Sequence, residues 1–232
     1  MSNAKKLVFD IETIGQDFKE LDKITQEYLL HYAESEEEEE ETKERLGFYP
    51  LTGEIVVIGV LNPDTGQGGV FAQPGKAKNP PEIIEEGVTA FWGNEKEILE
   101  KFWEAVRLYD YFISFNGRSF DVPFLMIRSA IQKVKPTKNL LSNRYLGSQV
   151  SGAKHVDLLD QLTFYGAFRR KFNLHMWTKA FGIESPKEGG VTGDDVTRLF
   201  TKGEAETIVR YNLRDLRSTA SLYEKWETYI NI

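Results

Sequence analysis

The sequence contains no cysteine, which excludes disulfide bonds and thiolate metal sites. It also has no apolar stretch of transmembrane length, and its first residues lack the apolar core of a secretory signal. These absences favour a protein of the reducing cytoplasm that has no membrane partner. The 232 residues, 41% of them hydrophobic and 28% charged, are enough for one well-packed core, so we expect a single domain.

Positive charge is scarce overall, which is unusual for a protein that binds nucleic acid, but the charges are unevenly distributed. The formal net charge is −7. Residues 1–110 hold 11 basic and 24 acidic side chains, whereas residues 111–190 hold 12 basic and 5 acidic ones. The middle of the chain can therefore present a basic face to an anionic ligand, while the N-terminal part would repel one.

Short apolar runs alternate with segments of helical spacing, which predicts a mixed α/β fold. We expect strands at residues 6–11, 54–61, 69–72, 111–115 and 155–157, and a loop at residues 74–90. The second and third strands would form an antiparallel hairpin on one side of a parallel core. Helices would cover the two faces of the sheet.

An acidic insertion is expected at residues 16–50, after the first strand. Its first half, from Phe18 to Tyr32, has the apolar spacing of a helix. The run from Glu36 to Glu41 that follows contains no apolar residue, which is typical of a solvated helix or a disordered loop. An alternative is an acidic gate that screens nucleic acid or contacts a basic partner.

Two acids, Asp10 and Glu12, end the apolar run from Leu7 to Phe9. Alternation along a strand places both side chains on the same side of the sheet. Two carboxylates at the end of a buried strand repel each other and lose solvation, so one becomes protonated or a divalent cation binds. Hard cations such as Mg²⁺ and Mn²⁺ prefer carboxylate oxygens. The alternative is that the strand ends in a polar turn, where the two acids occur by chance.

Other acids stand where helices are expected to begin. Asp121 follows the strand at 111–115, where it could cap a helix or face a ligand at the end of the strand. Asp157 and Asp160 have the spacing of a helix cap, and we interpret both as structural.

The last helix carries an acid on its apolar face. Ile208, Tyr211, Asp215 and Leu222 are spaced by three, four and seven residues, which places them on one side of the helix. Burial of Asp215 is costly unless it is paired or bound to a cation. Its neighbours Arg214 and Arg217 point elsewhere on the helix.

These three motifs resemble, in order and spacing, those of the DEDDy 3′–5′ exonucleases. The motifs are Asp10-x-Glu12, Asp121 within Asn-Gly-x-x-Phe-Asp-x-Pro-Phe-Leu, and Tyr211-x-x-x-Asp215. The resemblance is strongest to the exonuclease domain of family B DNA polymerases and its stand-alone bacterial relatives.

The resemblance covers residues 5–13 and 54–228 and leaves the segment 16–50 outside. It implies a ribonuclease H-like fold, in which helices flank a five-stranded mixed sheet of order 3-2-1-4-5. Residues 1–232 would then form one exonuclease domain with the acidic insertion at 16–50.

The implied activity is two-metal hydrolysis from the 3′ end of single-stranded nucleic acid, with DNA favoured over RNA. The resemblance assigns the metal ligands and the catalytic tyrosine: Asp10, Glu12, Asp121 and Asp215 would bind two Mg²⁺ or Mn²⁺ ions, and Tyr211 would orient the attacking water. A polymerase or repair complex would be the partner in trans. The alternatives are a ribonuclease H-like endonuclease and a non-catalytic nucleic-acid-binding module.

Candidate contacts to nucleic acid lie beside these motifs and in the basic, aromatic segment 168–172. They are Thr13, Asn116, Phe120, Arg169, Arg170 and Lys171. Phe120 could equally be a core residue, and the basic segment could be a solvated loop.

Overall fold

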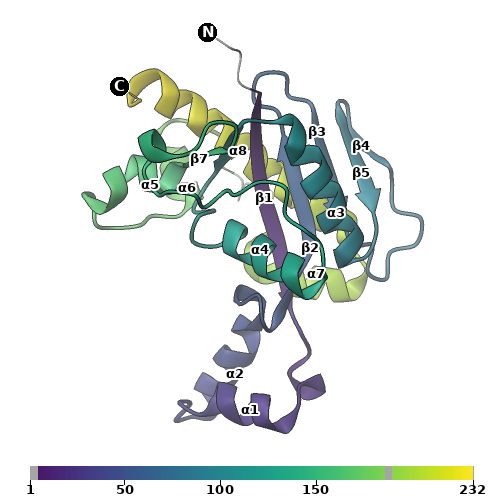
Figure 1. Ribbon diagram of the computed structural model, residues 1–232. Coiled ribbons are helices and arrows are strands. Elements are labelled where there is room, and N and C mark those ends of the chain that lie inside the picture. The colour runs from purple at the N-terminus through teal and green to yellow at the C-terminus, as the bar shows by residue number, and fades with distance from the viewer. Residues whose placement is uncertain (1–4, 186–189, 232) are drawn as a thin grey trace.

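The computed structural model describes residues 5–185 and 190–231, and its central feature is a mixed β-sheet between two layers of helices (Figure 1). The strands are β1 (Lys6–Gly15), β2 (Gly53–Leu61), β3 (Gly68–Ala72), β4 (Ile83–Glu85), β5 (Val88–Trp92), β6 (Tyr111–Ser114) and β7 (Lys154–Asp157). The α-helices are α1 (Lys23–Leu30), α2 (Glu36–Glu44), α3 (Glu95–Ala105), α4 (Asp121–Ile131), α5 (Leu158–Leu162), α6 (Leu174–Ala180), α7 (Val196–Lys202) and α8 (Ala205–Tyr229). None of the described helices is long and apolar enough to cross a bilayer.

The described strands form a sheet of order β4-β5-β3-β2-β1-β6-β7. β1 pairs antiparallel with β2 and parallel with β6, which pairs parallel with β7. The predicted order 3-2-1-4-5 is therefore confirmed as β3-β2-β1-β6-β7, but the predicted number of five strands is wrong. A loop had been expected over β4 and β5, where Ile84 and Val88 are buried and Gly87 supplies the turn at φ 79°.

Each face of the sheet packs against its own layer of helices, and β1 contributes alternate residues to the two layers. Val8 and Ile14 belong to the apolar cluster that includes residues of α7 and α8. Phe9 and Ile11 belong to the cluster that includes residues of α3 and α4. Alternation along the strand therefore directs Asp10 to the side that α8 covers.

Asp157 is a structural residue, as predicted. Its carboxylate caps α5 by accepting hydrogen bonds from the backbone amides of Leu159 and Asp160. It also accepts hydrogen bonds of 2.9 Å from the amides of Asn116 and Arg118, which fixes the turn after β6.

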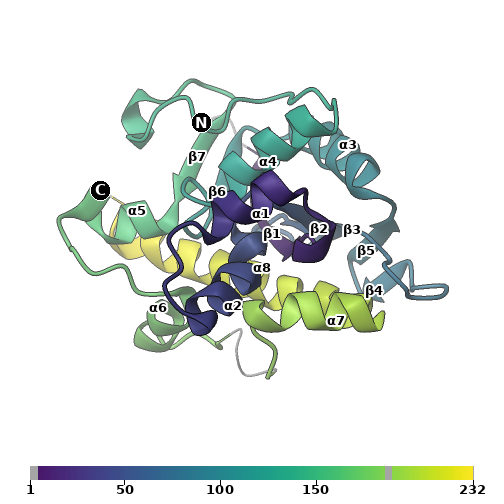
Figure 2. The same cartoon turned by 90° about the horizontal axis from the view of Figure 1, so that it is seen from below.

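The segment 16–50 forms an arm that projects from the body at the C-terminal end of β1 (Figure 1), and the view from below shows α1 and α2 within it (Figure 2). The acidic run begins α2, so a helix replaces the alternative of a disordered loop. Ser35 caps the helix by accepting a hydrogen bond from the Glu38 amide. Acids in the first turn suit the positive end of the helix dipole, which explains why six successive glutamates remain helical.

A buried ion pair joins α3 to α4 next to the arm. Glu95 accepts hydrogen bonds from Arg128 and from the amide of Ile55 in β2, while Arg128 also donates to the carbonyl oxygen of Pro50. The two side chains are 4% and 6% exposed, so neither charge can be solvated by water if its partner is removed.

We therefore expect Glu95→Ala to lower the free energy of unfolding by about 3–5 kcal/mol, because Arg128 is left buried without its partner. The exposed pair between Lys96 and Glu100 on the same helix provides the control. Glu100→Ala should cost less than about 1 kcal/mol. Urea unfolding of both variants measures the difference, and equal losses would show that burial of the Glu95 pair is unimportant.

Candidate active site

Three carboxylates converge between β1 and α8. Asp10 and Glu12 occupy successive positions on one face of β1, and Asp215 reaches them from α8. One ligand oxygen from each lies within 4.8 Å of the others. The pairing of β1 with β2 shifts register between Glu12 and Thr13, an irregularity often found beside functional sites. The sequence prediction that these acids share one site is supported by this geometry.

Asp121 is the fourth acid, and it does not act as a helix cap. It is the first residue of α4, whose N-cap position belongs to Phe120. The Asp121 carboxylate instead accepts a hydrogen bond of 3.0 Å from the backbone amide of Ile11, between Asp10 and Glu12. With the side chain 97% buried, this bond fixes the carboxylate beside the strand that carries the other two acids.

Burial and mutual repulsion raise the pKa values of these acids. Loss of solvation is the largest cause for Asp10 and Glu12, whose pKa values lie well above the ordinary range, and the negative charges of nearby acids raise them further. Burial also raises the pKa of Asp121 to about 7, against the opposing effect of the Ile11 amide. Such a set of oxygen donors is costly to ionise alone and fits a hard divalent cation.

Tyr211 lies one helical turn before Asp215 and is buried beside the acids. Burial, followed by the negative charges of Asp215, Glu12 and Asp10, raises the pKa of its hydroxyl far above the usual value. The guanidinium group of Arg214 lies 5.9 Å from the centre of the Tyr211 ring. Tyr211 is therefore a protonated phenol at neutral pH, able to donate and accept hydrogen bonds.

Asn212 is a residue of the site that the sequence analysis missed. Its side-chain nitrogen donates to Asp10 at 2.9 Å and to Glu12 at 3.3 Å, so it bridges the two acids of β1. Its side-chain oxygen is buried without a hydrogen-bond partner in the described structure. The bridge depends on Gly59 of β2, because a Cβ atom there would lie 1.9 Å from that oxygen.

A cleft of about 1180 Å³ is lined by one of the four acids, Glu12, and by two of the predicted nucleic-acid contacts. They are Thr13 and Phe120, which share the cleft with Glu12. The Thr13 hydroxyl is already engaged, since it donates to the carbonyl oxygen of Gly47 at 2.7 Å. Phe120 also packs against Phe124, with 5.5 Å between ring centres, so its core role and its place at the cleft coexist.

The other predicted contacts lie elsewhere. Asn116 adopts a left-handed conformation at φ 63°, its backbone N–H donates to the Asp157 carboxylate, and the residue does not line the cleft. The basic residues Arg169, Arg170 and Lys171 are exposed between α5 and α6 and do not line the cleft. Arg170 instead lies over the ring of Phe172, with 4.7 Å to its centre. Their contact with nucleic acid stays a prediction.

Comparison with known families shows the family of the chain. Residues 84–231 match a family described as a predicted 3′–5′ exonuclease related to the exonuclease domain of PolB, and residues 3–157 match the exonuclease domain of DNA polymerase family B. The chain therefore belongs to the 3′–5′ exonuclease domains of the family B polymerase type.

Individual relatives are much longer than this chain. It is 30% identical over 144 residues to a DNA polymerase of Desulfurococcus sp. (strain Tok), a match that covers 55% of this chain and 18% of that protein. The corresponding values for a DNA polymerase of Methanocaldococcus jannaschii are 28% over 140 residues, 54% and 8%.

The fold also matches a solved structure, that of the family B DNA polymerase from the hyperthermophilic archaeon Pyrobaculum calidifontis. The match has a TM-score of 0.60 and 20% identity, and it covers 97% of this chain and 24% of that one. It confirms the ribonuclease H-like fold class. The chain thus spans less than a quarter of each of these relatives.

The raised pKa values predict that the metal-free protein loses stability as the pH rises. The folded state keeps protons that the unfolded chain releases near pH 4, so this stability is present at low pH and disappears as the pH passes the folded pKa, which is about 7 for Asp121. Urea unfolding in chelator at about pH 5.5 and pH 8 measures the loss. Asp121→Asn cannot ionise and should show a smaller loss. An identical pH dependence in this variant would contradict the prediction.

The Asn212 bridge predicts a role in cation binding. Asn212→Ala removes the donor that holds Asp10 and Glu12 together, and we expect the affinity for Mn²⁺ to fall about 10- to 100-fold. Gly59→Ala should act in the same direction by displacing the Asn212 side chain.

Gly69→Ala in β3 is the matched control, since its Cβ atom would have no neighbour closer than 3.8 Å. Calorimetric titration with Mn²⁺ reports the affinity, and circular dichroism checks that each variant folds. Unchanged affinity in Asn212→Ala would show that the bridge is not needed.

Proposed function

We propose that this chain is a metal-dependent 3′–5′ exonuclease that removes nucleotides from the 3′ end of single-stranded nucleic acid, with DNA as the preferred substrate. The observation that supports it most strongly is the convergence of Asp10, Glu12 and Asp215 within 4.8 Å, with buried Asp121 fixed beside them. All four acids and the tyrosine of the family motifs are present. We further propose one exonuclease domain over residues 1–232 with 16–50 as an insertion.

The four acids would hold two divalent cations, Mg²⁺ or Mn²⁺. When bound, such ions lower the pKa of a water molecule and stabilise the attacking and leaving oxygens of a phosphodiester. Asp10, Glu12 and Asp215 supply the converging oxygens, and the Asn212 bridge keeps two of them oriented before any cation arrives. The Ile11 amide does the same for Asp121.

Tyr211 would orient the attacking water rather than deprotonate it. Its raised pKa keeps the phenol protonated, so it is unsuited to act as a general base at neutral pH. Asp215 lies near enough to raise the pKa of the Tyr211 hydroxyl through charge and a hydrogen bond, which fixes the hydroxyl next to the carboxylates. The proposed partner in trans is a polymerase or repair complex that presents a 3′ end.

The test uses single-stranded DNA and RNA labelled at either end, with Mg²⁺ or Mn²⁺. A 3′ label should appear first as mononucleotide, and a 5′ label should give a ladder that shortens with time. Chelator should stop the reaction, and Asp215→Asn should lose most activity because the site loses a cation ligand.

Asp64→Asn is the matched control, since Asp64 is an exposed acid that neither lines the cleft nor belongs to the converging acids. It should stay active. Internal cuts would favour an endonuclease, and strand binding without cleavage would favour a binding module.

Removal of the Tyr211 hydroxyl tests its role separately. Tyr211→Phe should lower turnover about 100-fold, because water is no longer oriented, while affinity for Mn²⁺ persists because no cation ligand is lost. Single-turnover kinetics and calorimetry measure the two quantities. Tyr223→Phe, on the same helix but bonded to Glu227, should leave both unchanged. Wild-type turnover in Tyr211→Phe would show that the Tyr211 hydroxyl does not orient the attacking water.

A further inference from the structure

The cleft that Glu12 lines is also lined by residues of the arm and of α7. Glu12, Thr13 and Phe120 line it beside the site. The arm contributes residues 43–45, 47 and 48, and α7 contributes Thr197, Arg198, Thr201 and Lys202, which lie on successive turns of one helix face. Part of the segment 16–50 therefore lines the cleft, although the arm as a whole projects from the body.

The root of the arm is held rigidly against the strand that carries the acids. Thr13 bonds to the carbonyl oxygen of Gly47, and a Cβ atom on Gly47 would lie only 2.9 Å from the backbone nitrogen of Gly15. Leu46 is buried, and its carbonyl oxygen accepts a hydrogen bond from Thr52. These contacts fix the position of the next residue, Phe48, relative to Glu12.

Phe48 is an exposed aromatic residue of the arm. Its side chain is 50% exposed, although the residue lines the same cleft as Glu12 and Phe120. A rigidly placed aromatic face that borders a nuclease cleft suits a nucleotide base, because every base can stack on it. Phe120 is half-buried and packs against Phe124, so the ring of Phe48 is more accessible than the ring of Phe120.

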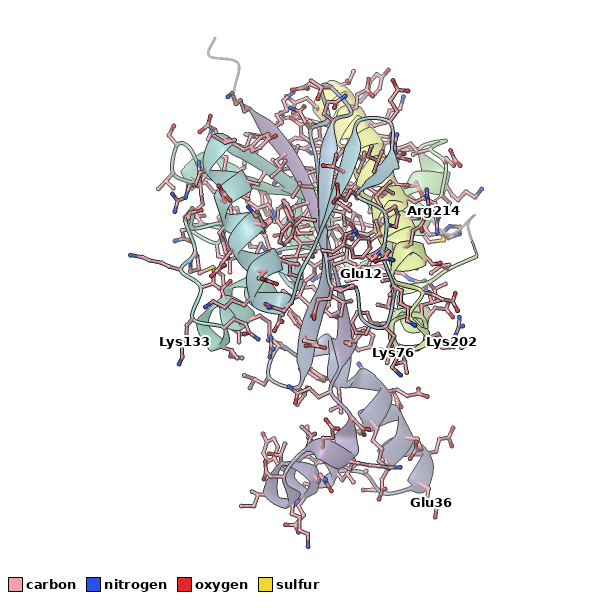
Figure 3. All side chains as sticks on the ribbon, turned by 90° about the vertical axis from the view of Figure 1, so that its right-hand side faces the viewer. Glu12, Glu36, Lys76, Lys133, Lys202 and Arg214 are labelled. Atoms are coloured by element: carbon pink, nitrogen blue, oxygen red, sulfur yellow. The ribbon has the colours of Figure 1, made fainter. Side chains whose placement is uncertain are left out.

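Charge along the cleft is mixed. Arg198 pairs with Asp195, and Glu41, Glu44 and Asp194 also line the walls. Lys202 forms no ion pair within the part of the chain that the structure describes, so it is the cation most available to a phosphate. The acidic run begins far from the site, since Glu36 lies at the far end of the arm from Glu12 (Figure 3), and its last residue, Glu41, lines the cleft.

We propose that this cleft is a strand-binding subsite, in which Phe48 stacks on a base near the 3′ end and Lys202 contacts a backbone phosphate. The ligand class is single-stranded nucleic acid, and the inference rests on the proposed exonuclease function. Stacking supplies most of the affinity, because acids on both walls offset the cations. The arm thereby becomes part of the substrate site.

The test measures binding of a single strand with 2-aminopurine near its 3′ end, in chelator so that no hydrolysis occurs. Stacking quenches this base. Phe48→Ala should weaken binding about 5- to 100-fold and restore the fluorescence. Phe48→Leu keeps an apolar side chain without a stacking face and should behave likewise.

Tyr49→Ala is the matched control, because Tyr49 is 52% exposed on the same arm but lines a different hollow. It should match the wild type in affinity and quenching. If Phe48→Ala and Tyr49→Ala both match the wild type, the subsite is overturned while the exonuclease assignment stands. If the wild type neither binds nor cleaves the strand, the proposed exonuclease function itself is wrong.

Salt dependence tests the phosphate contact. Lys202→Ala should reduce the slope of log affinity against log salt by about 0.7, the value for one phosphate neutralised on a single strand. Lys133, on the opposite side of the body (Figure 3), provides the control, and Lys133→Ala should leave the slope unchanged. An unchanged slope in Lys202→Ala would overturn this contact.

Discussion

Repulsion among buried carboxylates is the constraint on which the rest of the structure depends. Asp10 and Glu12 lie on one face of β1, and α8 brings Asp215 close enough for one oxygen of each acid to lie within 4.8 Å of the others. The fold meets this requirement with a close approach of α8 to β2 at Gly59, where the Asn212 amide fits and donates to both acids of β1. In the metal-free protein, the neutral Asn212 amide therefore supplies hydrogen bonds that cations would otherwise replace. The remaining free-energy cost of ionising Asp10 and Glu12 is seen in their raised pKa values.

The sequence was sufficient to predict the centre of the fold, because the centre has the strongest pattern. The apolar runs of β1, β2 and β6 and the resemblance to a known family together indicated the inner strand order. The hairpin of β4 and β5 was not predicted, because strands near the edge of a sheet are only partly buried and this hairpin follows a stretch rich in proline and lysine. The sequence of the acidic run does not distinguish a helix from disorder, since its helix is stabilised by the Ser35 cap and by the helix dipole rather than by an apolar face.

The acids and Tyr211 were predictable because their spacing is visible along the chain, whereas Asn212 was not. An asparagine in a helix carries no local signal, and its role appears only when Gly59 is brought beside it from β2. Phe48 was hidden for the same reason, since its cleft is built from the arm, β1 and α7 together. Conversely, the basic segment around Arg170 had a strong local pattern but lies away from the cleft. The composition of this segment therefore predicts its charge but does not predict where the segment lies in the fold.

The attachment of the arm divides it into two parts with different freedom to change. Its root is clamped to β1 through Thr13 and Gly47, so a shift there would move the strand that carries Asp10 and Glu12. Its outer part, α1 and most of α2, contributes no buried residue. The length and charge of the tip can therefore change with little effect on the strand that carries Asp10 and Glu12, and the tip is a suitable place to attach a tag or a second binding module.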